Sequence, residues 1–213
     1  MIPEDRLHRV RIKVCGITRI EDALLAASLG VDAVGFVFYD KSPRFIPPMK
    51  AATIIRALPP FVSAAGLFVN PGQDEIDDAL KHCPLDVLQL HGEETPEFCE
   101  AQTRRVIKAV PVHEKTDLKM AHAYDCPVLL DAKAPKGMYG GTGETFDWAL
   151  LDGFEHAHPL ILAGGLDMEN VRRALSVRQW DALDVSSGVE SMPGVKDAEK
   201  LHRFITIVRQ NGS

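Results

Sequence analysis

The chain has 213 residues, 46% of them hydrophobic, and a formal net charge of −6 at pH 7, a composition that suits one domain with a single sizeable core. The acidic balance excludes the basic stripe that nucleic acid requires, and the longest uncharged stretch, residues 57–73, is interrupted by prolines and does not span a bilayer. Residues 1–10 lack the apolar core of a secretory signal, so we expect a cytoplasmic protein whose partner is a small molecule.

Strand-like and helix-like segments alternate along the whole chain. The strand-like runs are short and rich in Val, Leu, Ile and Phe, and they cover residues 11–15, 32–38, 62–69, 86–90, 105–110, 128–131, 160–163 and 182–185. Segments with helical spacing follow them in turn, at residues 20–29, 50–58, 73–81, 95–103, 116–123, 146–151, 168–175 and 197–208. Near-continuous apolar strands separated by helices are typical of a parallel sheet that is covered on its outer face.

Eight such pairs predict a (β/α)8 TIM barrel, an α/β fold, formed by residues 11–213 as a single domain after an N-terminal extension of residues 1–10. An open doubly wound sheet is the main alternative, although eight pairs favour closure. Two connections are longer than the others, residues 39–48 and residues 132–145. Long connections in a compact domain are usually functional, and after a barrel strand they lie on the catalytic face.

Two of the apolar strand-like runs end in a chemically reactive side chain, Cys15 and Asp131. Side chains at the carboxyl ends of parallel strands surround the mouth where ligands bind, so this thiol and this carboxyl are predicted to form an acid/base pair. The remaining cysteines are Cys83, Cys99 and Cys126, and none has the C-x-x-C or nearby His spacing of a zinc site. We expect all the cysteines to be free thiols and expect no metal.

Two turns suited to an anion follow the seventh and eighth strands. They are Ala163-Gly164-Gly165-Leu166 and Val185-Ser186-Ser187-Gly188. Backbone N–H groups at such turns hold a phosphate without Lys or Arg, and barrels frequently bind phosphate at these two loops. Gly141 and Thr142 are placed to add a third wall. The alternative is that these glycines only turn the chain.

The segments at the strand ends form a specific set when they are taken in chain order. They are Lys13-Val14-Cys15-Gly16-Ile17-Thr18, Gln89-Leu90-His91-Gly92, Leu130-Asp131-Ala132, Gly140-Gly141-Thr142-Gly143 with Phe146-Asp147-Trp148, Leu162-Ala163-Gly164-Gly165-Leu166, and Asp184-Val185-Ser186-Ser187-Gly188-Val189-Glu190. This set resembles the phosphoribosylanthranilate isomerase family of tryptophan biosynthesis in order and spacing, across nearly the whole chain. The resemblance implies a (β/α)8 barrel that converts N-(5-phosphoribosyl)anthranilate to 1-(2-carboxyphenylamino)-1-deoxyribulose 5-phosphate by an Amadori rearrangement, without a cofactor.

The resemblance also implies a role for each matching residue. Cys15 would be the general base, Asp131 the general acid, and Arg44 the group that binds the anthranilate carboxylate. His91 and Asp184 match polar positions that line the family's pocket. The phosphate of the substrate would be held by Gly164, Gly165, Ser186, Ser187 and Gly188, with Gly141 and Thr142 closing over it. The resemblance leaves open whether the protein is a monomer or a homodimer.

The expected chemistry explains the choice of groups. Opening an aminated furanose requires a proton on the ring oxygen, and loss of the C2 proton then gives an enolamine. Asp131 must therefore stay protonated long enough to donate, and burial beneath residues 132–145 favours that form. Cys15 must be partly thiolate, and we expect partial exposure, helix N-termini or cations such as Lys13 to lower the pKa of its thiol.

Other interpretations remain open from the residues alone. The histidine-pathway aldose-ketose isomerase has similar phosphate loops but uses two aspartates, and Cys15 argues against it. A metal-dependent pentose-phosphate epimerase needs converging His and Asp ligands, and only His91 is well placed. A catalytically silent phosphosugar-binding barrel would not need both Cys15 and Asp131. Taken singly, Cys15 is most simply a core residue, Arg44 a solvated loop cation, and His91 a structural residue bonded to backbone.

Overall fold

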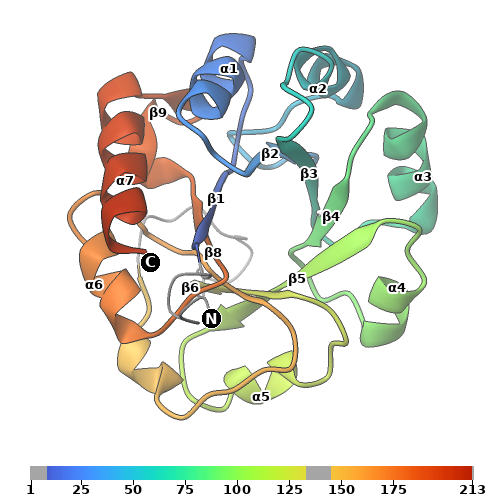
Figure 1. Ribbon diagram of the computed structural model, residues 1–213. Helices are drawn as coiled ribbons and strands as arrows, with labels where there is room; N and C mark the ends of the chain where they lie inside the picture. Colours follow the sequence, from blue (N-terminus) through green and yellow to red (C-terminus); the bar gives the residue numbers. More distant parts are fainter. Residues whose placement is uncertain (1–8, 133–144, 213) are drawn as a thin grey trace, which may run out of the picture.

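The computed structural model describes residues 9–132 and 145–212, and their strands form a closed barrel (Figure 1). The barrel strands are β1 Arg11–Val14, β2 Ala33–Val37, β3 Ser63–Phe68, β4 Val87–Leu90, β5 Arg105–Val112, β6 Val128–Ala132, β7 Leu160–Leu162 and β8 Ala182–Val185. Each strand pairs in parallel with the next one in sequence, and β1 pairs with β8 through the register Arg11↔Ala182 to Val14↔Val185. The predicted eight-stranded TIM barrel is therefore confirmed, and the open sheet is excluded.

The helices surround the barrel, as Figure 1 shows. They are α1 Ile20–Ser28, α2 Pro48–Ile55, α3 Gln73–His82, α4 Pro96–Glu100, α5 Leu118–Ala121, α6 Val171–Val177 and α7 Ala198–Asn211, with the 3-10 turns η2 Trp148–Leu151 and η3 Ser187–Val189. The α-helix predicted at residues 146–151 is wrong, because this segment forms only the four-residue turn η2. This segment instead makes the tighter i→i+3 hydrogen bonds of a 3-10 helix, a form that occurs in short pieces.

The last helix, α7, shows how local sequence sets an element. The Asp197 carboxylate accepts hydrogen bonds from the backbone N–H groups of Glu199 and Lys200, which caps the first turn. The buried side chains of α7 recur with helical spacing, and they are Leu201, Phe204, Ile205 and Val208. One face of α7 therefore packs into the larger core cluster while the other stays exposed.

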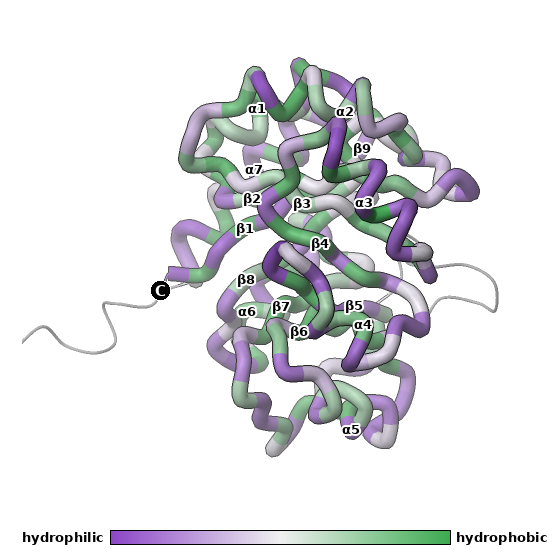
Figure 2. The backbone as a smooth tube through the Cα atoms, turned by 90° about the vertical axis from the view of Figure 1, so that its right-hand side faces the viewer, coloured by the Kyte–Doolittle hydropathy of each residue, from purple (hydrophilic) through white to green (hydrophobic). Residues whose placement is uncertain are grey.

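The barrel buries apolar side chains on both faces of its sheet. The larger cluster lies between strands and helices and includes the fully buried Trp180, Phe36, Phe68 and Phe204. A smaller cluster is made by Ala109, Leu129, Ile161 and Ala163. Figure 2 shows hydrophobic segments along β4, β6 and β7, and hydrophilic residues recurring along surrounding helices such as α3. Burial of both faces explains why the strands have continuous apolar runs instead of alternation.

A short hairpin that the sequence analysis missed follows β8. It consists of β9 Glu190–Met192 and β10 Val195–Lys196, which pair antiparallel, with Gly194 at a φ of +80° in the turn. Strands of three and two residues are too short to show a periodic pattern. Glu190 and Lys196 of this hairpin are buried, which places two charges next to the barrel mouth.

The first described residues are hydrogen-bonded to the end of α7. The backbone N–H of Val10 donates to the carbonyl of Gly212 at 3.1 Å, and Arg209 Nη1 donates to the carbonyl of Val10 at 3.0 Å. Residues 1–8 lie outside the described part, so the division of the chain at residue 10 stays a prediction. In the segments that the structure describes, none of the helices combines the length and hydropathy needed to cross a membrane.

Candidate active site

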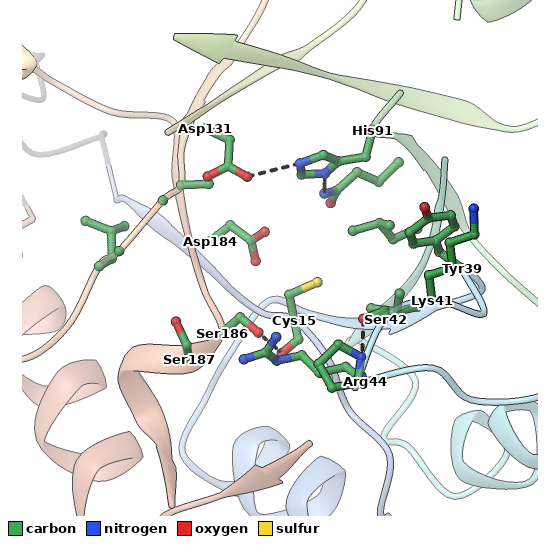
Figure 3. Close-up of a pocket in the computed structure, with 18 residues that line it drawn as sticks. Cys15, Tyr39, Lys41, Ser42, Arg44, His91, Asp131, Asp184, Ser186 and Ser187 are labelled. Atoms are coloured by element: carbon green, nitrogen blue, oxygen red, sulfur yellow. Dashed lines mark hydrogen bonds and ion pairs between the residues drawn. The ribbon is translucent and has the colours of Figure 1, made fainter. Parts of the chain in front are cut away.

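A pocket opens at the carboxyl ends of the barrel strands (Figure 3). Its walls come from the ends of β1, β2, β3, β4, β6, β7 and β8 and from several of the connections that follow them. The polar and charged side chains that line it are Cys15, Tyr39, Lys41, Ser42, Arg44, Gln89, His91, Asp131, Asp184, Ser186 and Ser187. Since ligands bind at this end of parallel barrels, the pocket is the candidate active site.

The structure brings Cys15 and Asp131 to this one pocket. Cys15 comes directly after β1, Asp131 lies in β6, and their exposed fractions are only 5% and 6%. In Figure 3 the thiol and the carboxyl lie on different sides of the pocket, with Asp184 between them. A thiol and a carboxyl on separate walls can act on two different atoms of one bound molecule.

The thiol of Cys15 lies beside a buried ion pair. Lys13 Nζ donates to Asp184 Oδ2 at 2.9 Å, and the positive charge of the same ammonium acts on the Cys15 thiol. Gly35 of β2 leaves room for both groups, because a Cβ there would lie 2.9 Å from Cys15 Sγ and 3.1 Å from Lys13 Nζ. Lys13 thus lies on the same side of the barrel as the thiol, whereas the need for Gly35 was not visible in the sequence.

Burial changes the ionisation of these groups. Burial raises the pKa of the Cys15 thiol, although the charge of Lys13 acts to lower it, so the predicted lowering is wrong. The prediction assumed partial exposure, which Cys15 does not have. Burial acts to lower the pKa of Lys13, but Asp184 and Cys15 outweigh it and raise that pKa. Burial also raises the pKa of Asp184 against the effect of Lys13. The raised pKa of Lys13 and the 2.9 Å contact between Lys13 Nζ and Asp184 Oδ2 favour the ionised pair.

Asp131 is held by a chain of side chains from β4. His91 Nε2 lies 3.0 Å from Asp131 Oδ2, and His91 Nδ1 lies 3.0 Å from Gln89 Nε2. The backbone N–H of Ala132 donates to Asp131 Oδ1 at 2.9 Å. With Gln89 Nε2 as donor, His91 Nδ1 accepts and Nε2–H donates to the carboxylate. His91 is therefore bonded to Asp131. The purely structural interpretation of His91, which predicted a bond to backbone, is wrong.

The same chain can also hold the protonated form of Asp131. Gln89 Oε1 is buried and accepts no hydrogen bond from the described residues. If the Gln89 amide is turned, Oε1 accepts from His91 Nδ1–H, and His91 Nε2 then accepts the proton of the acid. Gln89 was missed as a site residue, and its only sequence signal is its position two residues before His91 on the same face of a strand.

Arg44 is buried and not solvated, which corrects the interpretation of it as a loop cation. Its side chain lines the pocket with an exposed fraction of 8%, and its guanidinium hydrogen-bonds the Glu190 carboxylate. The β9–β10 hairpin supplies that carboxylate. Because the hairpin was not predicted, neither Glu190 nor its partner Lys196 was recognised as part of the site.

The two predicted phosphate turns meet beside the pocket. Gly164, Gly165, Ser186 and Ser187 line it, whereas Gly188 packs so closely on Leu166 that a Cβ there would lie 2.0 Å from the Leu166 carbonyl oxygen. Gly141 and Thr142 lie outside the described residues.

Gly164 connects this anion side to Asp131. Its φ is +80°, and a Cβ there would lie 2.5 Å from the backbone N of Ala132 and 2.7 Å from Asp131 Oδ1. Only glycine fits this conformation and this approach. The first phosphate turn and the carboxyl group are therefore packed directly together.

No cluster of three or more His, Cys, Asp or Glu side chains is arranged to hold a metal ion within residues 9–132 and 145–212. The polar groups that line the pocket include one thiol, two aspartates, an imidazole and the two cations Lys41 and Arg44. This set is suited to proton transfer and to anion binding.

Comparison with known proteins decides the family. Residues 12–207 match the family model for N-(5'phosphoribosyl)anthranilate (PRA) isomerase. The chain belongs to this isomerase family. It is 51% identical over 197 residues to the N-(5'-phosphoribosyl)anthranilate isomerase of Geobacter sulfurreducens. The aligned residues cover 92% of this chain and 97% of that protein. The resemblance noted at the strand ends is thus confirmed over almost the whole sequence.

Solved structures of PRA isomerases have the same fold. The enzyme of Thermotoga maritima superposes with a TM-score of 0.87 at 48% identity, covering 94% of this chain and 99% of that one. Another structure of that enzyme, described as monomers generated from a dimeric form, gives 0.83 at 43% identity, with coverage of 94% and 99%. A PRA isomerase in complex with reduced 1-(o-carboxyphenylamino)-1-deoxyribulose 5-phosphate gives 0.82 at 44% identity, with coverage of 95% and 98%.

Proposed function

We propose that this chain catalyses the Amadori rearrangement of N-(5-phosphoribosyl)anthranilate to 1-(2-carboxyphenylamino)-1-deoxyribulose 5-phosphate in tryptophan biosynthesis. One observation carries the proposal: a single pocket contains the thiol of Cys15, the carboxyl of Asp131, the guanidinium of Arg44 and two turns suited to an anion. Family membership supports the same reaction. The phosphorylated, carboxylated product analogue bound by a relative has the two anionic groups that such a pocket would need to bind.

Asp131 and Cys15 would act in sequence on the sugar. Asp131 donates a proton to the furanose ring oxygen while the C1–O bond breaks, so that its electron pair stays on oxygen and C1 becomes an iminium carbon. The Cys15 thiolate then removes the C2 proton. The electrons of the C2–H bond form C1=C2, and those of C1=N return to nitrogen, which gives an enolamine. The enolamine tautomerises to the ketone product.

The charges around the pocket suit the movement of a single proton. Lys13, Arg44 and Lys196 are cations, while Asp184 and Glu190 are anions, so these five groups leave one positive charge. One anion shared between Cys15 and Asp131 balances it. A thiolate with a protonated Asp131 and a thiol with an Asp131 carboxylate have the same net charge. The reaction passes the proton from one arrangement to the other through the substrate, without building up charge in a buried site.

The remaining residues would bind the substrate. Arg44 binds the anthranilate carboxylate, because a guanidinium presents donors in a geometry that matches a carboxylate. The carboxylate of Asp184 accepts a hydrogen bond from a sugar hydroxyl, since its Oδ1 is buried and has no partner among the described residues. His91 orients Asp131. The phosphate group is held by Gly164, Gly165, Ser186 and Ser187, with Gly188 supporting the second turn and Gly141 and Thr142 closing over it.

Turnover of freshly generated phosphoribosylanthranilate, followed by its fluorescence, tests the proposal. General acid or base groups contribute roughly 10²- to 10⁴-fold in rate, so we expect Asp131→Asn and Cys15→Ala to lose about that much of kcat while still binding a product analogue. Cys83→Ala is the matched control, because Cys83 is also a buried cysteine but lies outside the pocket. Normal turnover in either pocket variant would reject its assigned role, and no turnover by the parent chain would favour a silent sugar-phosphate-binding protein.

We also propose that the enzyme works in the cytoplasm, as a single barrel domain of residues 11–213 after the extension of residues 1–10, and as either a monomer or a homodimer. The T. maritima relative described as dimeric supports the second state. Light scattering during size-exclusion chromatography distinguishes the two. Truncation of residues 1–8 followed by thermal unfolding tests the boundary, since a dispensable extension leaves the transition unchanged.

A further inference from the structure

A buried group of charged side chains lies beside the pocket, apart from the acid/base pair. Glu190 Oε1 accepts from Arg44 Nε at 3.0 Å and from Lys196 Nζ at 2.7 Å. Glu190 Oε2 accepts from Arg44 Nη2 at 2.7 Å and from Nε at 3.2 Å. Arg44, Glu190 and Lys196 are called the Glu190 cluster below.

The Glu190 cluster joins three connections that are far apart in sequence. Arg44 lies in the connection after β2, and Glu190 and Lys196 belong to the hairpin after β8. Lys196 Nζ also donates to the carbonyl of Cys15 at 2.6 Å, directly after β1, and to the carbonyl of Ser186 at 3.3 Å. The Glu190 carboxylate therefore binds both Arg44 and Lys196. Lys196 in turn contacts the backbone carbonyls of Cys15 and of Ser186 in the second phosphate turn.

Glu190 occupies only one edge of the Arg44 guanidinium. The edge formed by Nε and Nη2 is bonded to the carboxylate, and no described residue accepts a hydrogen bond from Nη1. The stem of Arg44 lies against Gly16, where a Cβ would come within 2.5 Å of Arg44 Cδ. Figure 3 shows the guanidinium beside Cys15 and Ser186 at the pocket. The donors of Nη1 thus remain for a ligand.

The electrostatics of the Glu190 cluster favour an ionised Glu190. Burial acts to raise the pKa of Glu190, but hydrogen bonds and charges from Arg44 and Lys196 together lower it below its ordinary value. Burial lowers the pKa of Lys196, with Glu190 acting in the opposite direction. Glu190 also accepts a hydrogen bond from the backbone N–H of Gly194 at 3.3 Å. An ionised carboxylate with this many donors has a fixed orientation, which it imposes on its partners.

We propose that Glu190 is a positioning residue that aims Arg44 at the carboxylate of the aromatic ring, and so sets the preference of the enzyme for a carboxylated arylamine sugar phosphate. The inference rests on the proposed function, in which Arg44 binds that carboxylate. An arginine side chain has many rotamers of similar energy, and the bidentate bond to Glu190 selects one of them. Without the bond to Glu190, the Arg44 guanidinium keeps its charge but loses its fixed orientation toward the carboxylate of the substrate.

Substrate selectivity separates this role from a contribution to stability alone. Two glycosylamines of ribose 5-phosphate serve as substrates, one formed from anthranilate and one from aniline, which lacks the ring carboxylate. The measured quantity is the ratio of kcat/KM for the two substrates, with product quantified by liquid chromatography. A general loss of structure lowers both values together and leaves the ratio unchanged, whereas a misdirected Arg44 lowers only the value for the anthranilate compound.

The variants are Glu190→Gln, which removes the charge, and Arg44→Met, which removes the proposed ligand of the carboxylate. Glu199→Gln is the matched control, because it makes the same substitution on an exposed side chain of α7. We expect Glu190→Gln to reduce the ratio about tenfold, because the loss of a fixed charge-assisted hydrogen bond costs roughly 1.4 kcal/mol or more. If Glu190→Gln does not fold, Glu190→Asp keeps the charge in the cluster while shortening its reach, and it is judged by the same ratio.

The ratios measured for the variants separate the role of Glu190 from that of Arg44. A lower ratio in the Glu190 variant than in Glu199→Gln supports the positioning role. A ratio equal to that of the control, while Arg44→Met loses its preference, overturns the positioning role and leaves the function of Arg44 intact. If Arg44→Met keeps the parent's ratio, Arg44 does not read the carboxylate, and the inference about Glu190 is wrong as well. No turnover of the anthranilate compound by the parent chain refutes the proposed reaction itself.

Discussion

Replacing Lys13 with Met tests how the thiol of Cys15 is activated. Lys13 is the cation that acts most strongly to stabilise the thiolate of Cys15, and it is also the partner of Asp184 at 2.9 Å. A hydrogen bond to a charged group contributes roughly 1.5–3 kcal/mol, which corresponds to a factor of about ten to a hundred in the thiolate population. We therefore expect Lys13→Met to lower kcat by about that factor at neutral pH.

The direction of the pH effect follows from the same contact. Burial has already raised the pKa of Cys15, and Lys13 is the largest influence that opposes it. Removing Lys13 raises the pKa further, so the rising limb of the pH–kcat profile moves to higher pH. The rate of Cys15 alkylation by iodoacetamide, measured across pH, should move in the same direction, because only the thiolate reacts.

A second buried lysine provides the control for stability. Lys108 Nζ pairs with Glu94 at 2.8 Å, and both side chains are almost fully buried, yet neither lines the pocket. Breaking a buried ion pair costs roughly 3–5 kcal/mol, so Lys13→Met and Lys108→Met should show similar losses in chemical denaturation. Only Lys13→Met should change the alkylation profile. An unchanged profile in Lys13→Met, or an equal change in both variants, would refute the reasoning.

Three other predictions concern the fold and its groups. Gly164→Ala forces a Cβ to within 2.5 Å of the Ala132 nitrogen at a positive φ, so we expect about 1–3 kcal/mol of destabilisation in urea and a marked loss of kcat. Leu129→Ala, inside the barrel with an exposed fraction of 0%, should cost about 2–5 kcal/mol in the same assay with little change in KM. Burial raises the pKa of Cys83 to about 11 and that of Cys99 to about 12 from an ordinary 9.0, so the unfolded chain ionises first and stability should fall as pH rises above 9.0. Denaturation midpoints from pH 8 upward check this, and a Cys83→Ala, Cys99→Ala double variant that keeps the full alkaline loss would contradict it.

The barrel and much of its site could be predicted because they follow from local patterns. Each strand is a short apolar run, and each is followed along the chain by a helix or a short helical turn, so the order of pairs implied a closed parallel sheet. The end of a strand then fixes which side of the barrel its last side chains reach. Cys15 and Asp131 could be assigned to one mouth by this rule alone.

The parts that were missed or wrong depend on contacts between distant residues. The bond from Arg44 to Glu190 spans 146 positions, and that from Lys13 to Asp184 spans 171. No periodic pattern in the sequence indicates such partners, so Arg44 taken singly was most simply a solvated cation and only the family resemblance gave it a binding role, while Glu190 received no role. The burial of Cys15, which reverses the expected direction of its pKa shift, depends on the side chains and backbone packed around it.

The sequence by itself therefore determined the kind of fold, the side of the barrel that carries the chemistry, and several of the residues that reach it, because apolar runs and strand ends are properties of neighbouring positions. Only the tertiary structure decided the ionisation of the pocket side chains and their orientation within the pocket. Desolvation, ion pairing and the orientation of a guanidinium depend on every group within a few ångströms, and those groups come from opposite ends of the chain.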